Sequence, residues 1–332
     1  MTLPYPSRRC QGYCCETWVG NCREGGNGRY WAVTNSQVRL PSLEELAELI
    51  ASSTDTDVIF YSGAIRYWTA HQLTSNLDLR AKRSNVMLIL VTWGGDPSGA
   101  YKIARFLQDS YQKFSCYVTG VCKSAGTLIA LGAHEIIMSS TGELGPLDMQ
   151  ITKRDEVFES QSGLVVATSL RALREEAFDS FEDFVSRFKN GIGENASLKM
   201  ATEVAARLTT GLFGPIYTQL DPASVGETNR SMQVVQEYGH RLRERSRNCP
   251  RETVGQLIES YPSHDFVIDR AEARTLFFCV NDPTPDEALL VFILGGNAIS
   301  PPVDTPDVRF LSGERSTIKP RVRPQDLEKE HD

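Results

Sequence analysis

A continuous apolar run at residues 86 to 92 ends in Gly94 and Gly95, and a second apolar segment about 30 residues later leads through Gly120 to Ser124. A strand without alternating polar positions is typical of a parallel sheet that is buried on both faces. Parallel strands need a crossover, and the segment between the two runs has the length and pattern of a helix. This part of the chain is therefore restricted to a strand, a helix and a second, parallel strand.

The same alternation extends on both sides of this unit. Ser42 and Glu45 form a capping box, the signature of a helix N-terminus, where the regular part of the chain begins. The patterns that follow predict strands at residues 57–61, 86–92, 115–119 and 135–138, and helices at 69–83, 97–111 and 124–133. We expect the third strand to break at Gly120 and to restart as the helix whose first turn holds Ser124. The prediction is an α/β fold, a parallel sheet covered by helices, with the active site at the carboxyl ends of the strands.

Four segments of different texture divide the chain. Residues 1–40 lack a sustained period and predict an irregular, cysteine-containing arm, and residues 41–160 form the α/β core. Residues 161–299 add a helical region and the C-terminal part of the same catalytic domain, with long helices at 164–189, 196–208 and 232–247. Prolines and charges dominate residues 300–332, which we expect to be a flexible tail.

Charge and hydropathy exclude several partners. A formal net charge of -7 and a pI near 5.4 argue against general binding of nucleic acid or of anionic membrane surfaces. The longest late apolar run, residues 288–294, is far shorter than the roughly 20 residues that a membrane-spanning helix needs. The N-terminal residues lack the apolar stretch of a secretory signal. We expect a cytoplasmic protein with no membrane span and no nucleic-acid partner.

The cysteines fall into two groups. Cys116, Cys122 and Cys279 lie in apolar contexts where a free thiol behaves as a small hydrophobic residue, which suits a reducing compartment. The second group lies in the N-terminal arm and comprises Cys10, Cys14, Cys15 and Cys22. Four thiolates suffice for a structural zinc, but this spacing lacks the paired knuckles that usually present such ligands. The arm is therefore either a zinc site or a thiol-bearing extension, and we expect no metal or cofactor at the active site.

The glycine pair and Ser124 together suggest acyl-transfer chemistry. Paired glycines after a buried strand leave backbone amides facing a cleft, and one such amide stabilises an oxyanion by about 3 to 4 kcal/mol. Ser124 stands at the N-terminal end of a buried helix, where the peptide dipoles favour negative charge, and Ala125 offers a further amide. Read separately, Gly94 and Gly95 are a turn and Ser124 is a helix cap.

These motifs resemble those of a known superfamily. The segments WGGDPSGAYKIARFL, GVCKSAGTLIALGAHEIIMS and GELGPLDMQ are similar to ClpP/crotonase proteins and, more narrowly, to the SppA-like serine dehydrogenase proteinases, which are serine peptidases. The resemblance covers about residues 55 to 280. It implies a ClpP/crotonase-like fold in which Gly94 and Gly95 supply the oxyanion hole and Ser124 is the nucleophile. It also implies assembly into a homo-oligomer.

The general base is harder to identify, because a serine hydroxyl needs a histidine or a neutral lysine to take its proton. ClpP-type relatives carry a histidine about 25 residues after the serine, whereas this chain has Asp148 in that stretch. Among the histidines we favour His264, in a loop beside a proline, with Asp148 as the group that orients it. Lys153 and His240 remain alternatives. The other histidines are less suitable: His134 lies at the far end of its helix, and His71 and His331 are expected to be solvated.

Three functions compete. The first is a serine endopeptidase that hydrolyses peptides or unfolded protein through a Ser124 acyl-enzyme, with the need for an ATPase partner left open. The second is a crotonase-like acyl-CoA enzyme, which holds an enolate with the same amides and needs no serine. The third is a catalytically silent scaffold that binds peptides or assembles a complex.

Overall fold

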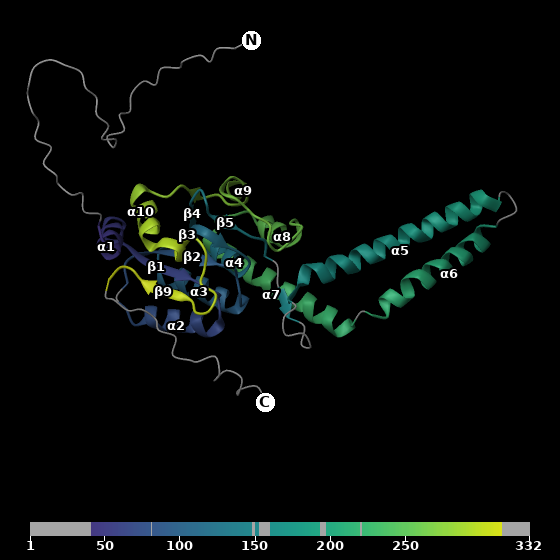
Figure 1. Ribbon diagram of the computed structural model, residues 1–332, viewed down its shortest axis with the longest axis horizontal. Coiled ribbons are helices and arrows are strands. Elements are labelled where there is room, and N and C mark those ends of the chain that lie inside the picture. Colours follow the sequence, from purple (N-terminus) through teal and green to yellow (C-terminus); the bar gives the residue numbers. More distant parts are fainter. Residues whose placement is uncertain are drawn as a thin grey trace, which may run out of the picture. The chain divides into compact units, whose positions relative to one another are not determined.

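The computed structural model describes residues 41–80, 82–147, 150–152, 160–192, 197–219 and 221–313 (Figure 1). These residues belong to one compact unit. The predicted arm at residues 1–40 lies outside the described residues, and so do its four cysteines.

The described strands build one mostly parallel sheet. Its order is β8 (Val280–Asn281), β4 (Glu135–Met138), β3 (Lys113–Cys122), β2 (Asn85–Thr92), β1 (Thr56–Ser62) and β9 (Asp307–Phe310). The strands from β8 to β1 run parallel, and β9 pairs antiparallel with β1. A short strand, β5 (Glu143–Leu144), pairs with the carboxyl end of β3. The α/β fold class predicted from the sequence is confirmed.

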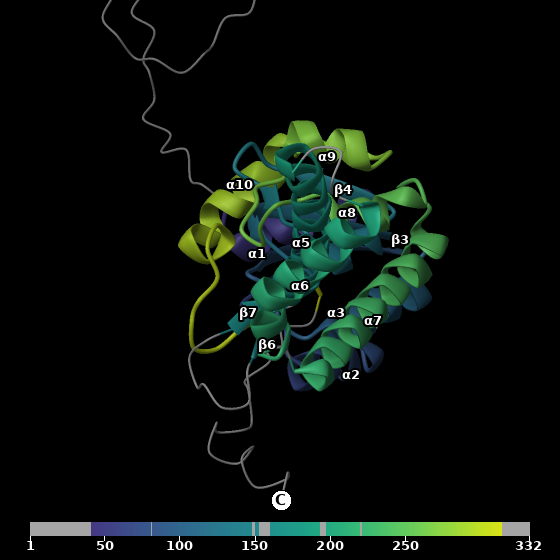
Figure 2. The same cartoon turned by 90° about the vertical axis from the view of Figure 1, so that its right-hand side faces the viewer.

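Helices cover both faces of this sheet (Figures 1 and 2). On one face, α1 (Leu43–Thr54) and α10 (Pro285–Leu294) share a core with Phe60, Ile89 and Tyr117. The other face is covered by α2 (Tyr67–Asp78), α3 (Pro97–Ser110), α4 (Ala125–Leu131), α7 (Pro222–Ser246) and α8 (Glu252–Glu259). Because successive side chains of a strand point to opposite faces, each central strand contributes to both cores and is apolar throughout.

The predicted start of α1 is confirmed in atomic detail. Ser42 Oγ accepts the Glu45 N–H at 3.2 Å, and the Glu45 carboxylate accepts the Ser42 N–H at 2.8 Å. This reciprocal pair satisfies two backbone donors that the helix itself leaves without a partner.

The predicted helical region is present and is longer than expected. α5 (Gly163–Ile192) contacts both α6 (Leu198–Tyr217) and α7. The sequence pattern predicted a helix that ends at residue 208, but α6 continues through Gly211, Gly214 and Pro215, which are residue types that disfavour a helix interior. The remaining short elements are β6 (Gln150–Thr152), β7 (Ser160–Ser162), α9 (Arg270–Leu276) and the 3-10 turn η2 (Gly295–Ala298).

The predicted break at Gly120 is wrong. β3 runs through Gly120 to Cys122, and α4 begins at Ala125. The glycine is needed for a close approach, because a Cβ at this position would overlap the carbonyl group of Ile299. That carbonyl also accepts the Val121 N–H at 3.1 Å. A glycine within a strand marks either a bend or a close backbone contact, and the sequence does not distinguish the two.

The expectation of a tail after residue 300 is also wrong in part. Residues 307–310 form β9, which places Phe310 opposite Ile59. The segment is held further by the Val58 N–H, which donates to Ser312 Oγ at 2.9 Å, and by the Leu311 N–H, which donates to the Val58 carbonyl at 2.9 Å. Its apolar pattern is too short to stand out among the prolines and charges around it.

We expect Phe310→Ala to lower the free energy of unfolding by about 3 kcal/mol, as is typical when a buried phenylalanine is truncated. The Phe310 side chain is only 8% exposed. Val303→Ala is the matched control, because Val303 lies in the same segment but is 93% exposed. Denaturant unfolding followed by circular dichroism measures both variants. Equal stability of the two would contradict a structural role for β9.

Candidate active site

The glycine pair and Ser124 lie at the carboxyl ends of two adjacent parallel strands. Thr92 ends β2 and pairs in register with Cys122, which ends β3. The Lys123 N–H then donates to the Thr92 carbonyl at 2.9 Å, so the two loops leave the sheet side by side. Ligands and substrates of open α/β sheets bind at such carboxyl ends.

Ser124 has a strained backbone. Its φ of 49° and ψ of -110° are rare for a residue with a Cβ, and it stands at the turn between β3 and α4. Its side chain makes no capping hydrogen bond to α4, which argues against the reading of Ser124 as a simple helix cap. Strained strand-to-helix turns of this kind present the nucleophile in α/β-hydrolases. The local geometry is therefore that of a half-buried serine held in a fixed orientation by its backbone.

The glycine pair makes room for this turn. Gly94 has a φ of +120°, and a Cβ there would lie 3.0 Å from the Ser124 Cβ and 3.3 Å from the Lys123 carbonyl oxygen. Gly95 has a φ of +137°, and its Cβ would overlap the carbonyl oxygen of Ile65. The same Ile65 accepts the Asp96 N–H at 2.8 Å and donates its own N–H to the Gly94 carbonyl at 2.8 Å. A side chain at Gly94 would push the loop away from Ser124, and one at Gly95 would push it away from Ile65.

The amides of the two glycines differ in their bonding. The Gly94 N–H donates to Thr92 Oγ1 at 2.9 Å, and the Thr92 hydroxyl donates back to the Gly94 carbonyl at 3.1 Å. Within the described part of the chain, no hydrogen bond is formed by the N–H of Gly95 or of Ala125. The amides that remain available to an oxyanion are thus those of Gly95 and Ala125, while Gly94 acts as the spacer that lets the loop contact Ser124.

Asp96 and Thr92 hold the glycine turn in place. Asp96 caps α3, with its carboxylate accepting the N–H groups of Ser98 at 2.9 Å and Gly99 at 3.2 Å. Thr92 was not predicted as a site residue. Its buried hydroxyl forms hydrogen bonds with both the N–H and the carbonyl of Gly94. A threonine at the end of an apolar strand carries no signal that separates it from its β-branched neighbours.

The loop that carries His264 lies beside this site. It joins α8 to α9, and its Asp265 and Phe266 carbonyls accept hydrogen bonds from the Lys123 side chain at 3.2 and 3.0 Å. Lys123 directly precedes Ser124, so the loop lies within one lysine side chain of the Ser124 backbone. His264 itself is partly buried.

The other candidate bases are placed differently. His134 lies at the amino end of β3, where its Nδ1 accepts the Phe114 N–H at 3.1 Å and burial lowers its pKa. Phe114 and Cys122 pair with Val86 and Thr92, six residues apart on β2, so at about 3.3 Å per strand residue His134 lies roughly 20 Å from Ser124. His240 lies on α7 and His71 on α2. Asp148 and Lys153, both named from the sequence, lie outside the described residues, and so does His331.

The cysteines near the site are not suited to nucleophilic catalysis. Burial raises the pKa of Cys122, two residues before Ser124, well above its ordinary value, and it raises the pKa of Cys116 to about 12. A thiolate is therefore disfavoured at both positions near neutral pH. Cys116, Cys122, Cys249 and Cys279 are all free thiols.

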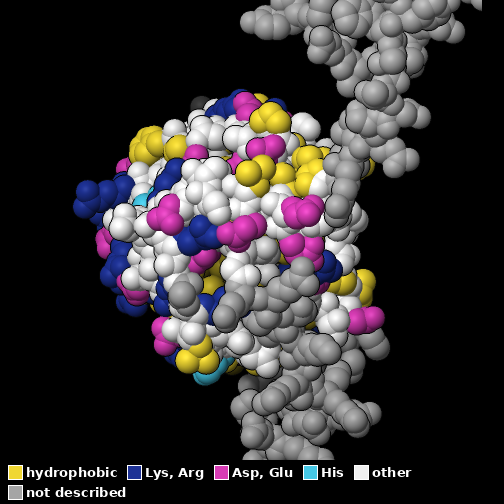
Figure 3. Space-filling view, turned by 90° about the vertical axis from the view of Figure 1, so that its left-hand side faces the viewer, with side chains coloured by type: hydrophobic (Ala, Val, Ile, Leu, Met, Phe, Trp, Pro, Cys, Tyr) yellow, Lys and Arg dark blue, Asp and Glu magenta, His cyan; other side chains and the backbone are white. Residues whose placement is uncertain are grey.

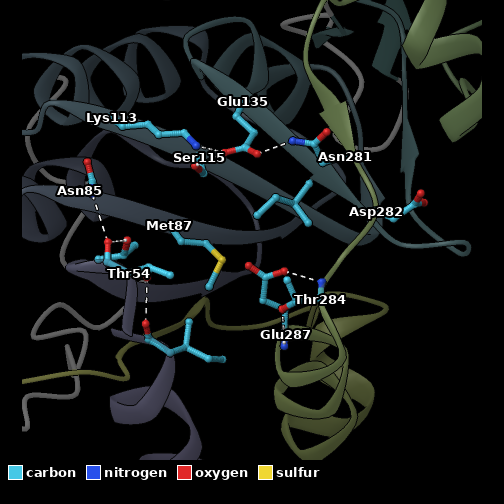
Figure 4. Close-up of a pocket in the computed structure, with 13 residues that line it drawn as sticks. Thr54, Asn85, Met87, Lys113, Ser115, Glu135, Asn281, Asp282, Thr284 and Glu287 are labelled. Atoms are coloured by element: carbon cyan, nitrogen blue, oxygen red, sulfur yellow. Dashed lines mark hydrogen bonds and ion pairs between the residues drawn. The ribbon is translucent and has the colours of Figure 1, made fainter. Parts of the chain in front are cut away.

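A cavity of about 320 Å³ lies at the amino ends of the strands, opposite the Ser124 turn (Figure 4). Its walls include Lys113 and Glu135, which form an ion pair, and Asn281, which also bonds Glu135. Burial opposes ionisation of Glu135, but the hydrogen bonds from Lys113, Asn281 and Ser115 outweigh it and lower the pKa of the carboxyl. The polar groups of this cavity thus bond one another, far from the Ser124 turn.

Wider features of the described residues bear on possible partners. No group of three or more His, Cys, Asp and Glu side chains among them has the arrangement of a metal site. None of the helices described is both long and apolar enough to cross a bilayer. On the face seen in Figure 3, basic and acidic side chains are interleaved, which argues against polyanion binding through that face.

Known proteins resemble this chain over part of its length. An uncharacterized protein of Methanocaldococcus jannaschii is 29% identical over 188 residues, which cover 53% of this chain and 56% of that protein. The match thus spans only about half the length of that relative. The solved structure of the 1510-N membrane-bound stomatin-specific protease aligns with a TM-score of 0.25 and 19% identity, covering 45% of this chain and 67% of that chain.

A family model matches the segment that holds the candidate site. Residues 72–228 match the family described as ClpP-like SDH-type serine proteinase. They include the glycine turn, Ser124 and the helices α5 and α6. The resemblance stated from the sequence motifs is thereby confirmed: over residues 72–228 the chain is similar to the ClpP-like SDH-type serine proteinases.

Proposed function

We propose that this protein is a serine endopeptidase that hydrolyses peptide bonds through a Ser124 acyl-enzyme. The observation that carries the proposal is the strained turn at Ser124, with its φ of 49°, in contact with the Gly94 turn. Backbone strain persists only where the surroundings enforce it, and it clusters at functional sites. A helix cap would need no such conformation, and this serine makes no capping bond.

The amides of Gly95 and Ala125 form the oxyanion hole in this proposal. The Gly95 amide belongs to the loop after β2, and the Ala125 amide belongs to the first residue of α4. A carbonyl attacked by Ser124 Oγ would develop its negative charge between them, where preorganised donors lower the barrier most. Gly94 contributes by its lack of a side chain.

The reaction then follows the usual steps of acyl transfer. Ser124 Oγ attacks the scissile carbonyl carbon, and the hydroxyl proton passes to the His264 imidazole. The tetrahedral adduct collapses, the peptide C–N bond breaks, and the leaving amine takes the proton from His264. Water then attacks the acyl-enzyme with His264 again as base, which releases the acid and restores Ser124. Asp148 is the proposed group that orients the base.

Cytoplasmic peptides or unfolded protein segments are the proposed substrates. The free thiols at Cys116, Cys122, Cys249 and Cys279 suit a reducing compartment. The cleft chemistry requires an extended backbone that reaches the Gly95 and Ala125 amides, which a compact folded substrate does not offer.

We also propose that the chain assembles with copies of itself through α6. Among the side chains of α5 and α6 whose burial the structure describes, only those of Ala201 and Ala205 are buried, whereas α6 exposes an apolar stripe of Met200, Leu208, Leu212 and Ile216. Arg207 and Lys199 flank this stripe, and α5 exposes acidic residues at positions 175, 176, 179, 182 and 183. A two-fold axis lets one stripe pack against its own copy and brings basic and acidic surfaces of the same chain within reach.

Ser124→Ala should abolish covalent labelling by a fluorophosphonate probe, because the probe reacts with an activated serine hydroxyl. Mass spectrometry of the labelled peptide identifies the site. Ser98→Ala is the control, since Ser98 lies near the same loop, is equally half-buried, and uses its backbone and not its side chain to bond Asp96. A native protein that resists the probe would contradict the proposal and favour the acyl-CoA enzyme or the silent scaffold.

His264→Ala should slow fluorophosphonate labelling of Ser124 by about 10² to 10⁴-fold, the usual contribution of a general base. His71→Ala, an exposed histidine on α2, should label at the native rate. Labelling rates of the two variants are measured by in-gel fluorescence of samples quenched at successive times. Should His240→Ala and not His264→Ala slow the reaction, the base would be assigned wrongly.

Leu212→Glu should shift the protein to a smaller mass in sedimentation equilibrium, because Leu212 is 57% exposed in the isolated chain and lies on the apolar stripe of α6. Thr210→Glu adds the same charge about 200° away around the helix and should leave the mass unchanged. A wild-type protein that sediments as a single chain at all concentrations would reject the assembly.

A further inference from the structure

Lys123 is an unusual residue that the proposed chemistry does not use. Among the described residues it is the only Lys, Arg, Asp or Glu whose side chain is buried, with 2% exposure. Burying a charge is costly unless it is paired and hydrogen-bonded. The residue also directly precedes Ser124.

The Lys123 ammonium is fully engaged with one loop and one carboxylate. Nζ donates to the Asp265 carbonyl at 3.2 Å and to the Phe266 carbonyl at 3.0 Å, and it lies 3.6 Å from Glu143 Oε1. Its stem lies against Gly145, where a Cβ would come within 2.5 Å of the lysine Cδ. The path of this side chain is therefore fixed along its whole length.

The loop that receives these bonds carries His264. Its far end is held by Ile268, which exchanges two backbone hydrogen bonds with Leu144 at 2.9 and 3.0 Å. Nearer to His264, the Phe266 ring packs on Tyr261, with 5.0 Å between ring centroids, and the Phe266 N–H donates to the Ser263 carbonyl. These last contacts are internal to the loop. Phe266 also packs against the hydrophobic core. Among the hydrogen bonds given for the described residues, those from the Lys123 side chain join the two residues after His264 to the segment that holds Ser124.

We propose that Lys123 is a positioning residue for the Ser124 site. Its ammonium holds the His264 loop against the turn between β3 and α4, and thereby fixes the imidazole relative to the serine hydroxyl. The inference rests on the proposed function, in which His264 takes the Ser124 proton.

Lys123→Met tests this role, because methionine keeps an apolar stem and removes every donor and the charge. We expect the rate of fluorophosphonate labelling to fall by about a hundredfold, the loss typical of a reacting group displaced by about 1 Å. The His264 ring resonances of the folded variant should also shift in NMR spectra, because the loop that carries the imidazole loses its hydrogen bonds to Lys123. A residue that only stabilised the fold would not shift them.

Lys113→Met is the matched control. It removes a lysine from the other end of the same strand, where Lys113 pairs with Glu135. The labelling rate and the His264 ring resonances should stay at native values in this variant. If Lys123→Met behaves in the same way, the inference is overturned.

Two further measurements keep the test decisive. NMR spectra of the His264 ring compare the native protein with Lys123→Met, and unchanged ring resonances overturn the inference even if no labelling occurs. If the native protein is not labelled but its His264 resonance changes in Lys123→Met, the proposed function is contradicted and the positioning role of Lys123 is not. If Lys123→Met does not fold, Gly145→Ala replaces it, because the added Cβ displaces the lysine stem without changing its charge. We expect the same slower labelling and the same altered His264 resonance. Native labelling and a native resonance in a folded Gly145→Ala protein whose lysine is displaced would overturn the inference.

Discussion

The hydrogen bond from the Lys123 N–H to the Thr92 carbonyl is the interaction on which the candidate site depends. It continues the pairing of β2 and β3 one step beyond the strands, at 2.9 Å, and sets the spacing between the glycine turn and Ser124. The spacing is small enough that Gly94 cannot carry a Cβ without approaching the Ser124 Cβ. The chemistry of the site is thus fixed by main-chain geometry before any side chain is considered.

Holding Ser124 in its rare conformation costs free energy, of the order of 1–3 kcal/mol. The surrounding core offsets this cost, because α4 is buried over its whole length and Thr127 anchors it through a hydrogen bond to the Gly145 carbonyl at 2.7 Å. The Gly145 N–H in turn approaches Thr127 Oγ1 at 3.3 Å. The strand β5, the turn after it and α4 are therefore locked together, and the strained residue has no room to relax.

The parts that the sequence predicted well are those in which local pattern and tertiary role coincide. The apolar strands, the capping box at Ser42 and the proximity of Gly94 to Ser124 follow from periodicity and from the rule that parallel strands end at one edge. The prediction failed where one residue type has two uses. Gly120 marks a close approach to Ile299 and not a break in the strand. The short apolar pattern around Phe310 lies among prolines, and only its pairing with β1 identifies it as a strand.

The buried lysine illustrates the deeper limit of sequence reasoning. Lys123 is adjacent to Ser124 in the sequence, but no local pattern predicts that its ammonium donates to carbonyls some 140 residues later in the chain. A buried ion pair is weak evidence for stability, since a well-packed hydrophobic side chain of similar size is often as stable or more so. A cation at this position therefore gains little for the fold that methionine would not supply. Its contribution is directional: three oxygen atoms from two distant segments bond or pair with one nitrogen, which ties the loop that carries His264 to the residue before Ser124.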